Sequence, residues 1–414
     1  MRDPRTEVRK WWWSGENMIM RDDQETESLR DVRHIRVCSS PDTYCGHPRQ
    51  GGIWNFGGGE IAVAHIHAPC AYQSHADVRH DHGGYPSRAV VLLQRSIDGG
   101  ETWPEENNVV IFDETLKWEE RRDRLYGTQN QPPGILDMSK PESIFFWGRS
   151  YTGQAHSGAE LAQTCFVLRS GDKGKTWEER PALVHNPFEH GRLIHRDNHP
   201  TVHMPDGTFL GALSAWPGRV CLFGSDDDGL SWDYLSLIAS DPSGLGGGRP
   251  TYAGLVLLPN GRLLCVTLNL SGRRNCIQIN HSDDGGYSWS EPRPIVRWGD
   301  SPWKARRPTD VSLPYSFHYR SPWPMLLDDG RLLVLFARRK PPFGIGCLFS
   351  EDQGASWSRE FIIRCDAAQE DLGYPVATQL EDGRIFTAYY YNVGEGNMQV
   401  GGARFIGGSF FRLP

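Results

Sequence analysis

The stretch SDDDGLSW at residues 225–232 decides the fold, because the chain carries this pattern five times with small changes. The other copies are SIDGGETW at 96–103, SGDKGKTW at 170–177, SDDGGYSW at 282–289 and SEDQGASW at 350–357. In the shared form Ser-x-Asp-x-Gly-x-Ser/Thr-Trp, the Asp, Gly and Ser/Thr residues favour a tight turn, and the Trp ring can be buried beneath it. The repeat therefore predicts a repeated architecture in which each copy is a turn between two strands.

A second unit recurs along the chain: an apolar strand, a Gly-containing turn and another apolar strand. Turns such as PDG, PNG, DDG and EDG favour β-hairpins. Six such hairpins begin at Gly51, Pro132, His199, Pro250, Ser321 and Tyr374. Six units of about four strands each predict an all-β, six-bladed β-propeller. A strand expected at residues 33–38 would complete the last blade and remove a free sheet edge.

Residues 28–414 are predicted to form this single propeller domain, and residues 1–27 an N-terminal extension. The net charge of −7 is spread over 44 basic and 51 acidic residues, which argues against a nucleic-acid partner. No apolar run approaches the roughly 18 residues of a membrane helix, so no membrane partner is expected. The oligomeric state stays open.

The start of the chain lacks the apolar core of a secretory signal, and the nine cysteines show no CxxC pair. Their odd number and strand-like surroundings favour buried free thiols. We therefore expect a cytoplasmic protein, or a secreted or periplasmic one if a signal has been removed.

Residues that precede the innermost strands of a propeller converge on one central pocket. Arg49, Arg249 and Arg320 arrive there from blades 1, 4 and 5. A guanidinium matches a carboxylate bidentately, so three of them predict a site for an acidic ligand, unless each arginine pairs with a neighbouring acid. Other polar residues at these positions are His47, Asn130, Gln131, Asp197, His199, Tyr319, Asp371 and Tyr374.

The repeated turn resembles the Asp-box of the sialidase superfamily, and the chain is similar to bacterial sialidases and BNR-repeat glycosidases over nearly its full length. Arg49 and Arg320 resemble the family's blade-1 and blade-5 arginines, and Tyr374 in DLGYPVATQ resembles its tyrosine nucleophile. The resemblance implies that three arginines hold a sugar carboxylate and that the tyrosine attacks the anomeric carbon with a glutamate beside it. It also implies an acid/base aspartate on a blade-1 loop, for which Asp77 is preferred over Asp81.

Two positions depart from the family pattern. The segment GGGRPTYAGLV has Arg249 where the glutamate partner of the tyrosine is expected, and AHIHA has His65 and His67 in place of a second blade-1 arginine. Tyr374 thus lacks an assigned base. Another possibility is that His67 or His199 acts as a general base, as expected for propeller-fold lyases that attack uronic acids. Trp323, near Arg320, is the expected wall of a sugar pocket. The HIH and HDH pairs of the blade-1 loop lack the spacing of a recognised metal site, so no metal or other cofactor is predicted.

Together these residues predict an exo-acting glycoside hydrolase of sialidase type that removes a terminal acidic sugar from a glycan. The predicted catalytic residues are Tyr374, Asp77 and His199. The predicted substrate-binding residues are Arg49, Arg249, Arg320, His67 and Trp323. Two alternatives remain: a polysaccharide lyase that acts on uronic acids and a sugar-binding propeller without catalytic activity.

Overall fold

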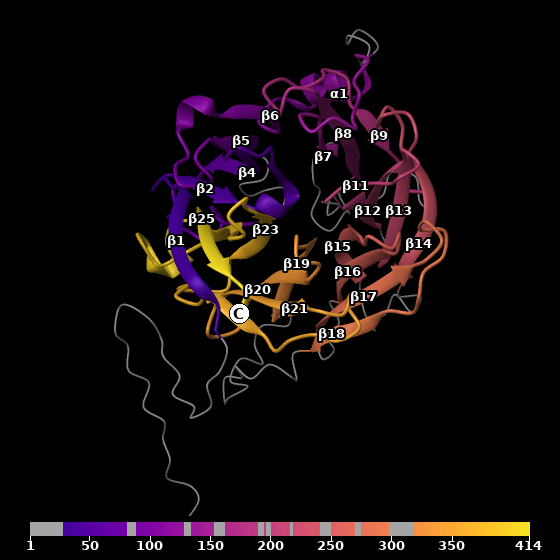
Figure 1. The fold of residues 1–414 in the computed structure, drawn as a ribbon. Coiled ribbons are helices and arrows are strands. Elements are labelled where there is room, and N and C mark those ends of the chain that lie inside the picture. Colours follow the sequence, from indigo (N-terminus) through magenta and orange to yellow (C-terminus); the bar gives the residue numbers. More distant parts are fainter. Residues whose placement is uncertain are drawn as a thin grey trace, which may run out of the picture.

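The computed structural model describes residues 28–80, 88–127, 134–152, 162–188, 194–195, 200–215, 218–240, 250–269, 275–297 and 318–414. Strands in these ranges form six antiparallel sheets, which stand as blades around a central axis (Figure 1). The prediction of an all-β, six-bladed β-propeller is therefore confirmed. The predicted extension at residues 1–27 lies outside the described residues.

The first three blades follow the chain order. Blade 1 has β2 (Thr43–Gly46) and β3 (Gly52–Asn55) innermost, joined by the short helix η1 (Pro48–Gln50), and then β4 (Ile61–Pro69), β5 (Val90–Ser96) and β6 (Val109–Asp113). The helix α1 (Trp118–Tyr126) precedes blade 2, which has β7 (Ile144–Thr152), β8 (Ala162–Ser170) and β9 (Ala182–Val184). Blade 3 has β10 (Ile194–His195), β11 (Val202–His203), β12 (Phe209–Ala215), β13 (Arg219–Ser225) and β14 (Asp233–Ser240).

The other three blades have four strands each within the described ranges. Blade 4 has β15 (Pro250–Leu257), β16 (Leu263–Asn269), β17 (Cys276–Ser282) and β18 (Arg293–Arg297). Blade 5 has β19 (Tyr319–Leu326), β20 (Leu332–Arg338), β21 (Gly344–Ser350) and β22 (Phe361–Arg364). Blade 6 has β23 (Gly373–Gln379), β24 (Ile385–Tyr391), β25 (Phe405–Arg412) and, at its outer edge, β1 (Arg30–Cys38).

The N-terminal strand closes the ring. β1 pairs antiparallel with β25, from Arg30 opposite Arg412 to Cys38 opposite Ile406, and Figure 1 shows the two side by side. The strand predicted at residues 33–38 lies within β1, so this part of the prediction is confirmed. Closure pairs the outer edge of β25 with a strand from the other end of the chain, which ties blade 6 to blade 1.

Five of the six predicted hairpins are present, as β3–β4, β11–β12, β15–β16, β19–β20 and β23–β24. In blade 2, the first predicted strand is not found, because residues 134–143 have no strand. The side chain of Asp137 accepts the backbone N–H of Ser139, and Asp228 from blade 3 accepts that of Met138. These local bonds take donors that a sheet ladder would need.

Each copy of the eight-residue pattern is a turn between the last two strands of its blade. In the copy at 225–232, the Ser225 hydroxyl donates to Asp227 Oδ1 at 2.8 Å and accepts the backbone N–H of Gly229 at 2.8 Å. Asp227 also accepts the backbone N–H and the hydroxyl of Ser231. Gly229 has φ 81°, and a Cβ atom there would lie 2.3 Å from the ring of Phe145. The turns are structural. They lie on the face where the innermost strands end: in blade 1, the Gly99 N–H of the turn donates to the carbonyl of Gly59, in the loop that follows β3.

Apolar side chains from the strands fill the space between neighbouring blades, and every residue of β20, β21 and β24 is buried. All nine cysteines are free thiols, of which Cys38 and Cys365 are only partly buried. The prediction of free, mostly buried thiols is confirmed. In the described part of the chain, no helix is long and apolar enough to cross a membrane.

The turn at 225–232 leads to a first prediction. Asp227→Ala should lower the melting temperature, and it should cost about 1–3 kcal/mol, because the turn loses the acceptor of its bonds from Ser225 and Ser231. Burial alone would raise the pKa of Asp227, but hydrogen bonds from Ser231 and Ser225 hold it below its ordinary value. The carboxylate therefore stabilises the fold above about pH 4, and this contribution is lost as the pH falls through the folded-state pKa. Thermal unfolding measured at several pH values checks both effects. Unchanged stability in the variant would contradict this role.

Candidate functional site

Four residues at matching places in their blades have a left-handed backbone: His47 (φ 59°), Tyr252 (φ 55°), Ser321 (φ 49°) and Tyr374 (φ 53°). In β15, β19 and β23, this residue lies in a β-bulge that shifts the register with the next strand. Residues other than glycine rarely adopt such angles, and bulges and local strain are frequent at functional sites. The four residues therefore mark the face of the propeller on which the innermost strands begin.

Two tyrosines meet at the centre of this face. The hydroxyl groups of Tyr252 and Tyr374 lie 2.6 Å apart and form a hydrogen bond across blades 4 and 6. The imidazole of His47 stacks on the ring of Tyr374, with centroids 4.3 Å apart and an interplanar angle of 21°. Gly373 makes room for this arrangement, since a Cβ atom there would lie 2.3 Å from Ala337 Cβ. We call His47, Tyr252 and Tyr374 the tyrosine cluster.

Two arginines from blade 5 adjoin the tyrosine cluster. The guanidinium of Arg320 lies 4.7 Å from the ring centroid of Tyr252 and hydrogen-bonds Tyr374. That of Arg339 lies 5.9 Å from the ring centroid of Tyr374 and donates to the Tyr390 hydroxyl at 2.7 Å. Burial would lower the pKa of both arginines, but the tyrosines raise it. Both groups stay cationic, so this region suits an anionic ligand.

A carboxylate network lies beside the cluster. Asp371 accepts hydrogen bonds from Arg404 Nε at 2.9 Å and from the Tyr390 hydroxyl at 2.8 Å. His80 Nε2 lies 2.9 Å from Asp371 Oδ1, and the Tyr44 hydroxyl lies 3.3 Å from both residues. Burial alone would raise the pKa of Asp371, but His80 and Arg404 hold it well below its ordinary value. Asp371 therefore stays ionised and orients His80, whose ring centroid lies 5.1 Å from that of His47.

Arg49 has a different place from the one predicted. Its side chain is fully buried, and it donates to the backbone carbonyls of Pro322, Tyr252 and Ala253 at 2.7–2.9 Å. These carbonyls belong to the register-shifted segments of β15 and β19, so the guanidinium joins blades 1, 4 and 5. The prediction that Arg49 holds a substrate carboxylate does not fit this geometry, because its Nε and Nη2 donate to the main chain. Arg49 supports the backbone of Tyr252 instead.

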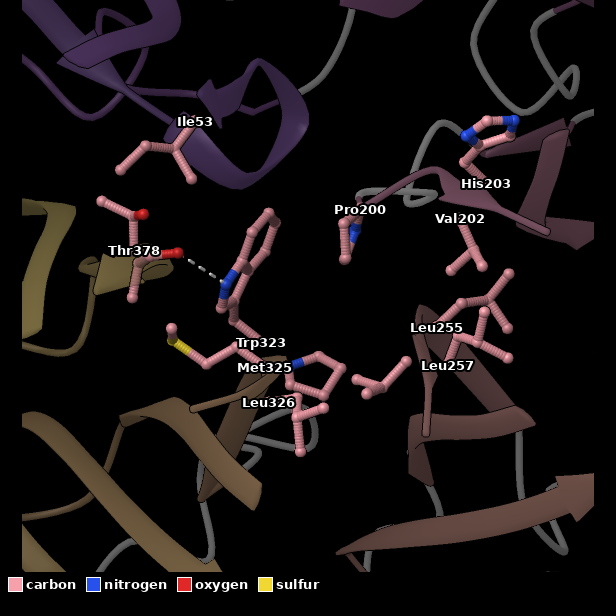
Figure 2. A pocket seen from close by; sticks show the side chains of 13 residues that line it. Ile53, Pro200, Val202, His203, Leu255, Leu257, Trp323, Met325, Leu326 and Thr378 are labelled. Carbon is pink, nitrogen blue, oxygen red and sulfur yellow. Dashed lines mark hydrogen bonds between the residues drawn. The ribbon is translucent and has the colours of Figure 1, made fainter. Parts of the chain in front are cut away.

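Trp323 also lies below the tyrosine cluster. Its indole is 3% exposed and donates to the Ala377 carbonyl at 3.2 Å. It lines an apolar cavity of about 360 Å³ in the central channel, and Figure 2 shows the ring between Ile53 and Pro200. Neither Arg320 nor Tyr374 lines this cavity, so the part of the channel that Trp323 lines is separate from the position predicted for the wall.

The remaining predicted site residues do not join the cluster in the described structure. Asp77 accepts the backbone N–H groups of Gln73 and Ser74 at 3.0 and 2.9 Å, and the bond from Ser74 is the main cause that lowers its pKa. A carboxylate with a lowered pKa that holds its own loop is a poor general acid, which argues against the predicted role. His67 lies in another cluster, with Cys38 and Cys45. Arg249 and His199, like the alternative Asp81, lie outside the described residues.

Sequence reasoning did not select Tyr252, Arg339 or His80 as site residues, although the structure places all three beside Tyr374 or Asp371. A signal for Tyr252 was present, because PTYAGLV and LGYPVAT place a tyrosine at the same distance from the hairpin turn. Arg339 follows the second strand of its blade, and His80 belongs to a long loop. The repeat pattern alone therefore does not predict that either side chain reaches the mouth of the propeller.

The sequence profile of the family described as BNR repeat-like domain matches residues 90–387. This is more than half of the 414 residues. The chain belongs to this family. Tyr252, Arg320, Arg339, Asp371 and Tyr374 lie within the matched part of the BNR-repeat propeller, whereas His47 and His80 precede it. No curated protein sequence matches the chain significantly.

Solved structures share the fold of this BNR-repeat propeller. A protein of unknown function from Dyadobacter fermentans is 20% identical with a TM-score of 0.66, over 92% of this chain and 99% of the other. A Hadza microbial sialidase is 17% identical with a TM-score of 0.58, over 89% of this chain and 66% of the other. A mutant Trypanosoma rangeli sialidase with trans-sialidase activity is 11% identical with a TM-score of 0.54, over 93% of this chain and 60% of the other. The predicted resemblance to the sialidase superfamily is thus confirmed for the fold.

Proposed function

We propose that this BNR-repeat propeller is a glycoside hydrolase that removes a terminal carboxylate-bearing sugar from a glycan. The observation that carries the proposal is the hydrogen-bonded pair of Tyr252 and Tyr374 next to two partly buried cationic arginines, Arg320 and Arg339. A sialidase-like fold supports a sugar substrate as an analogy only.

Arg320 and Arg339 would bind the carboxylate of the sugar. Arg339 uses Nε and Nη2 for the Leu372 carbonyl and the Tyr390 hydroxyl, and among the described residues its Nη1 makes no hydrogen bond. That nitrogen can therefore donate to a ligand without breaking a bond in the protein. Two guanidinium groups at one site favour a planar carboxylate and give discrimination against neutral sugars.

Tyr374 would be the nucleophile. A phenol is weakly nucleophilic unless its oxygen gains negative charge. The hydrogen bond from the Tyr252 hydroxyl and the adjacent guanidinium of Arg320 both stabilise such charge on the Tyr374 oxygen. In this proposal the pair takes over the role of the glutamate that the sialidase resemblance implies. Tyr374 would react as the phenolate, after its hydroxyl proton has passed to solvent water. The phenolate oxygen attacks the anomeric carbon as the bond to the leaving oxygen breaks, and water later displaces the tyrosine as phenolate.

His80 would protonate the leaving oxygen and then deprotonate the attacking water. It comes from the same blade-1 loop on which the acid/base group was predicted, and Asp371 fixes the orientation of its ring. An imidazole can both donate and accept a proton, and the contact with Asp371 holds the ring in place for both steps. His80 thus replaces Asp77 in the proposed mechanism.

A second function is favoured by one specific observation. The groups in contact with Tyr374 in the described structure are phenols, an imidazole and guanidinium groups. This set also suits β-elimination from a uronic acid, in which arginines neutralise the carboxylate while tyrosine and histidine transfer the protons. A lyase leaves an unsaturated uronate that absorbs in the near ultraviolet, whereas a hydrolase does not.

The test is a panel of terminal sialosides, other keto-sugar acid glycosides and uronate oligosaccharides, with product analysis. We expect release of a terminal acidic sugar without a gain of near-ultraviolet absorbance. In the His80→Asn variant, turnover should fall about 100-fold or more, while Asp77→Asn should stay within about threefold. An unsaturated product would favour the lyase, binding without turnover would indicate a sugar-binding protein, and a larger loss in Asp77→Asn would restore the role of that residue.

A further inference from the structure

Two cysteines and a histidine meet where the closing strand reaches blade 1. Cys38 is the last residue of β1, and Cys45 on β2 lies opposite His67 on β4 in the antiparallel register. The sulfur atoms of Cys38 and Cys45 are 3.2 Å apart. A ring nitrogen of His67 and the two sulfur atoms all lie within 4.8 Å of one another. Three strands from two blades thus bring three metal-ligating groups together.

The distances are compatible with one shared ion. Zn²⁺ binds thiolate sulfur at about 2.3 Å and imidazole nitrogen at about 2.0–2.1 Å, so ligand atoms in a tetrahedral site lie roughly 3.5–4 Å apart. Small side-chain rotations would bring the three atoms to this spacing. Two sulfur ligands and one imidazole favour Zn²⁺ over the hard cations Mg²⁺ and Ca²⁺.

The neighbouring residues hold the three groups in place. His65, two residues before His67 on β4, is fixed by Gln94, with His65 Nε2 and Gln94 Oε1 2.8 Å apart. Cys45 is fully buried, whereas Cys38 and His67 are partly buried. The two thiols and the imidazole therefore face one point that is largely shielded from water.

We propose that Cys38, Cys45 and His67 bind a divalent transition-metal cation of the Zn²⁺ type, which ties the closing strand β1 to blade 1. With three protein ligands, the fourth tetrahedral position is left to a water molecule. Sequence motifs did not indicate this site, because its ligands come from separate strands rather than from a short local pattern.

The cation would also stabilise the strand that leads into the candidate active site. Successive residues of a strand point to opposite faces. Cys45 faces the cluster with Cys38 and His67, whereas its neighbour Tyr44 reaches toward Asp371 and His80. Metal binding would therefore restrain β2 without contacting the substrate.

Titration of the reduced, chelator-treated full chain with Co²⁺ and with Zn²⁺ tests the proposal. We expect one Co²⁺ per chain, with thiolate-to-cobalt charge-transfer absorption and the visible bands of a tetrahedral ion. Zn²⁺ should displace the cobalt and raise the melting temperature. Cys38→Ser and His67→Asn should each weaken binding about 100-fold or more. Cys365→Ser, which alters the other partly exposed cysteine, should bind like the original chain.

The variants are first checked for folding by circular dichroism, and the readout does not depend on catalytic activity. A reduced original chain without the charge-transfer band would overturn the proposal, as would an equally strong band in folded Cys38→Ser. Loss of the band in Cys365→Ser alone would place the cation elsewhere and overturn it too.

Discussion

Arg320→Lys should reduce kcat/KM on acidic substrates almost as much as Arg320→Ala, by roughly 30- to 1,000-fold, or about 2–4 kcal/mol of transition-state binding. The lysine keeps a positive charge, but a single ammonium cannot replace the planar fork that contacts a carboxylate with two N–H groups. The change would also remove the guanidinium that lies over Tyr252 and bonds Tyr374. Steady-state kinetics with an acidic substrate and its neutral analogue measure the effect.

The matched control is Arg331→Lys, at the other end of the β19–β20 hairpin, where the arginine pairs with Asp329 on the surface. This variant should stay within about twofold of the original activity, because exposed ion pairs contribute little. An Arg320→Lys variant with unchanged kcat/KM, or with equal losses on acidic and neutral substrates, would contradict carboxylate recognition by Arg320.

Tyr374→Phe should lower kcat on the order of 1,000-fold or more while the ligand still binds. The substitution keeps the ring that stacks on His47 and removes only the hydroxyl that bonds Tyr252. A fluorinated substrate analogue should label Tyr374 with a glycosyl group in the original chain, and peptide mass spectrometry should find no label in the variant. Calorimetry with the product sugar measures the retained binding.

Tyr287→Phe is the control, since Tyr287 is 72% exposed in the turn at 282–289, on the opposite face from the tyrosine cluster. It should keep full activity. If Tyr374→Phe turns over at the original rate, Tyr374 is not the nucleophile, and His47 or His199 becomes the better candidate. A different set of results would support β-elimination at the same site. In that case Tyr374→Phe is inactive, and the original chain gives an unsaturated product but no covalent label.

Arg320 and Arg49 show what the position of a residue within the repeat can predict and what it cannot. Both arginines lie at the start of an innermost strand, and register alone predicts that both reach the mouth. Arg320 does lie beside Tyr374, but Arg49 follows the left-handed residue His47, so η1 turns its side chain into the channel. Arg320 directly precedes the left-handed residue of its blade, whereas Arg49 lies two residues after the left-handed residue of its own, and no local sequence pattern reports this difference.

Contiguous residues were enough to specify the propeller, because each eight-residue turn closes with its own Ser, Asp and Gly, and each hairpin carries its own turn signal. They also specified the closing strand and the convergence of Tyr374 and Arg320, which follows from six repeats around one axis. Only the tertiary structure decided that Tyr252 bonds Tyr374, that Asp371 orients His80 and that Cys38 and Cys45 meet His67. These contacts join different blades or distant loops, so they depend on bulges and loop paths that the packing of the whole ring imposes.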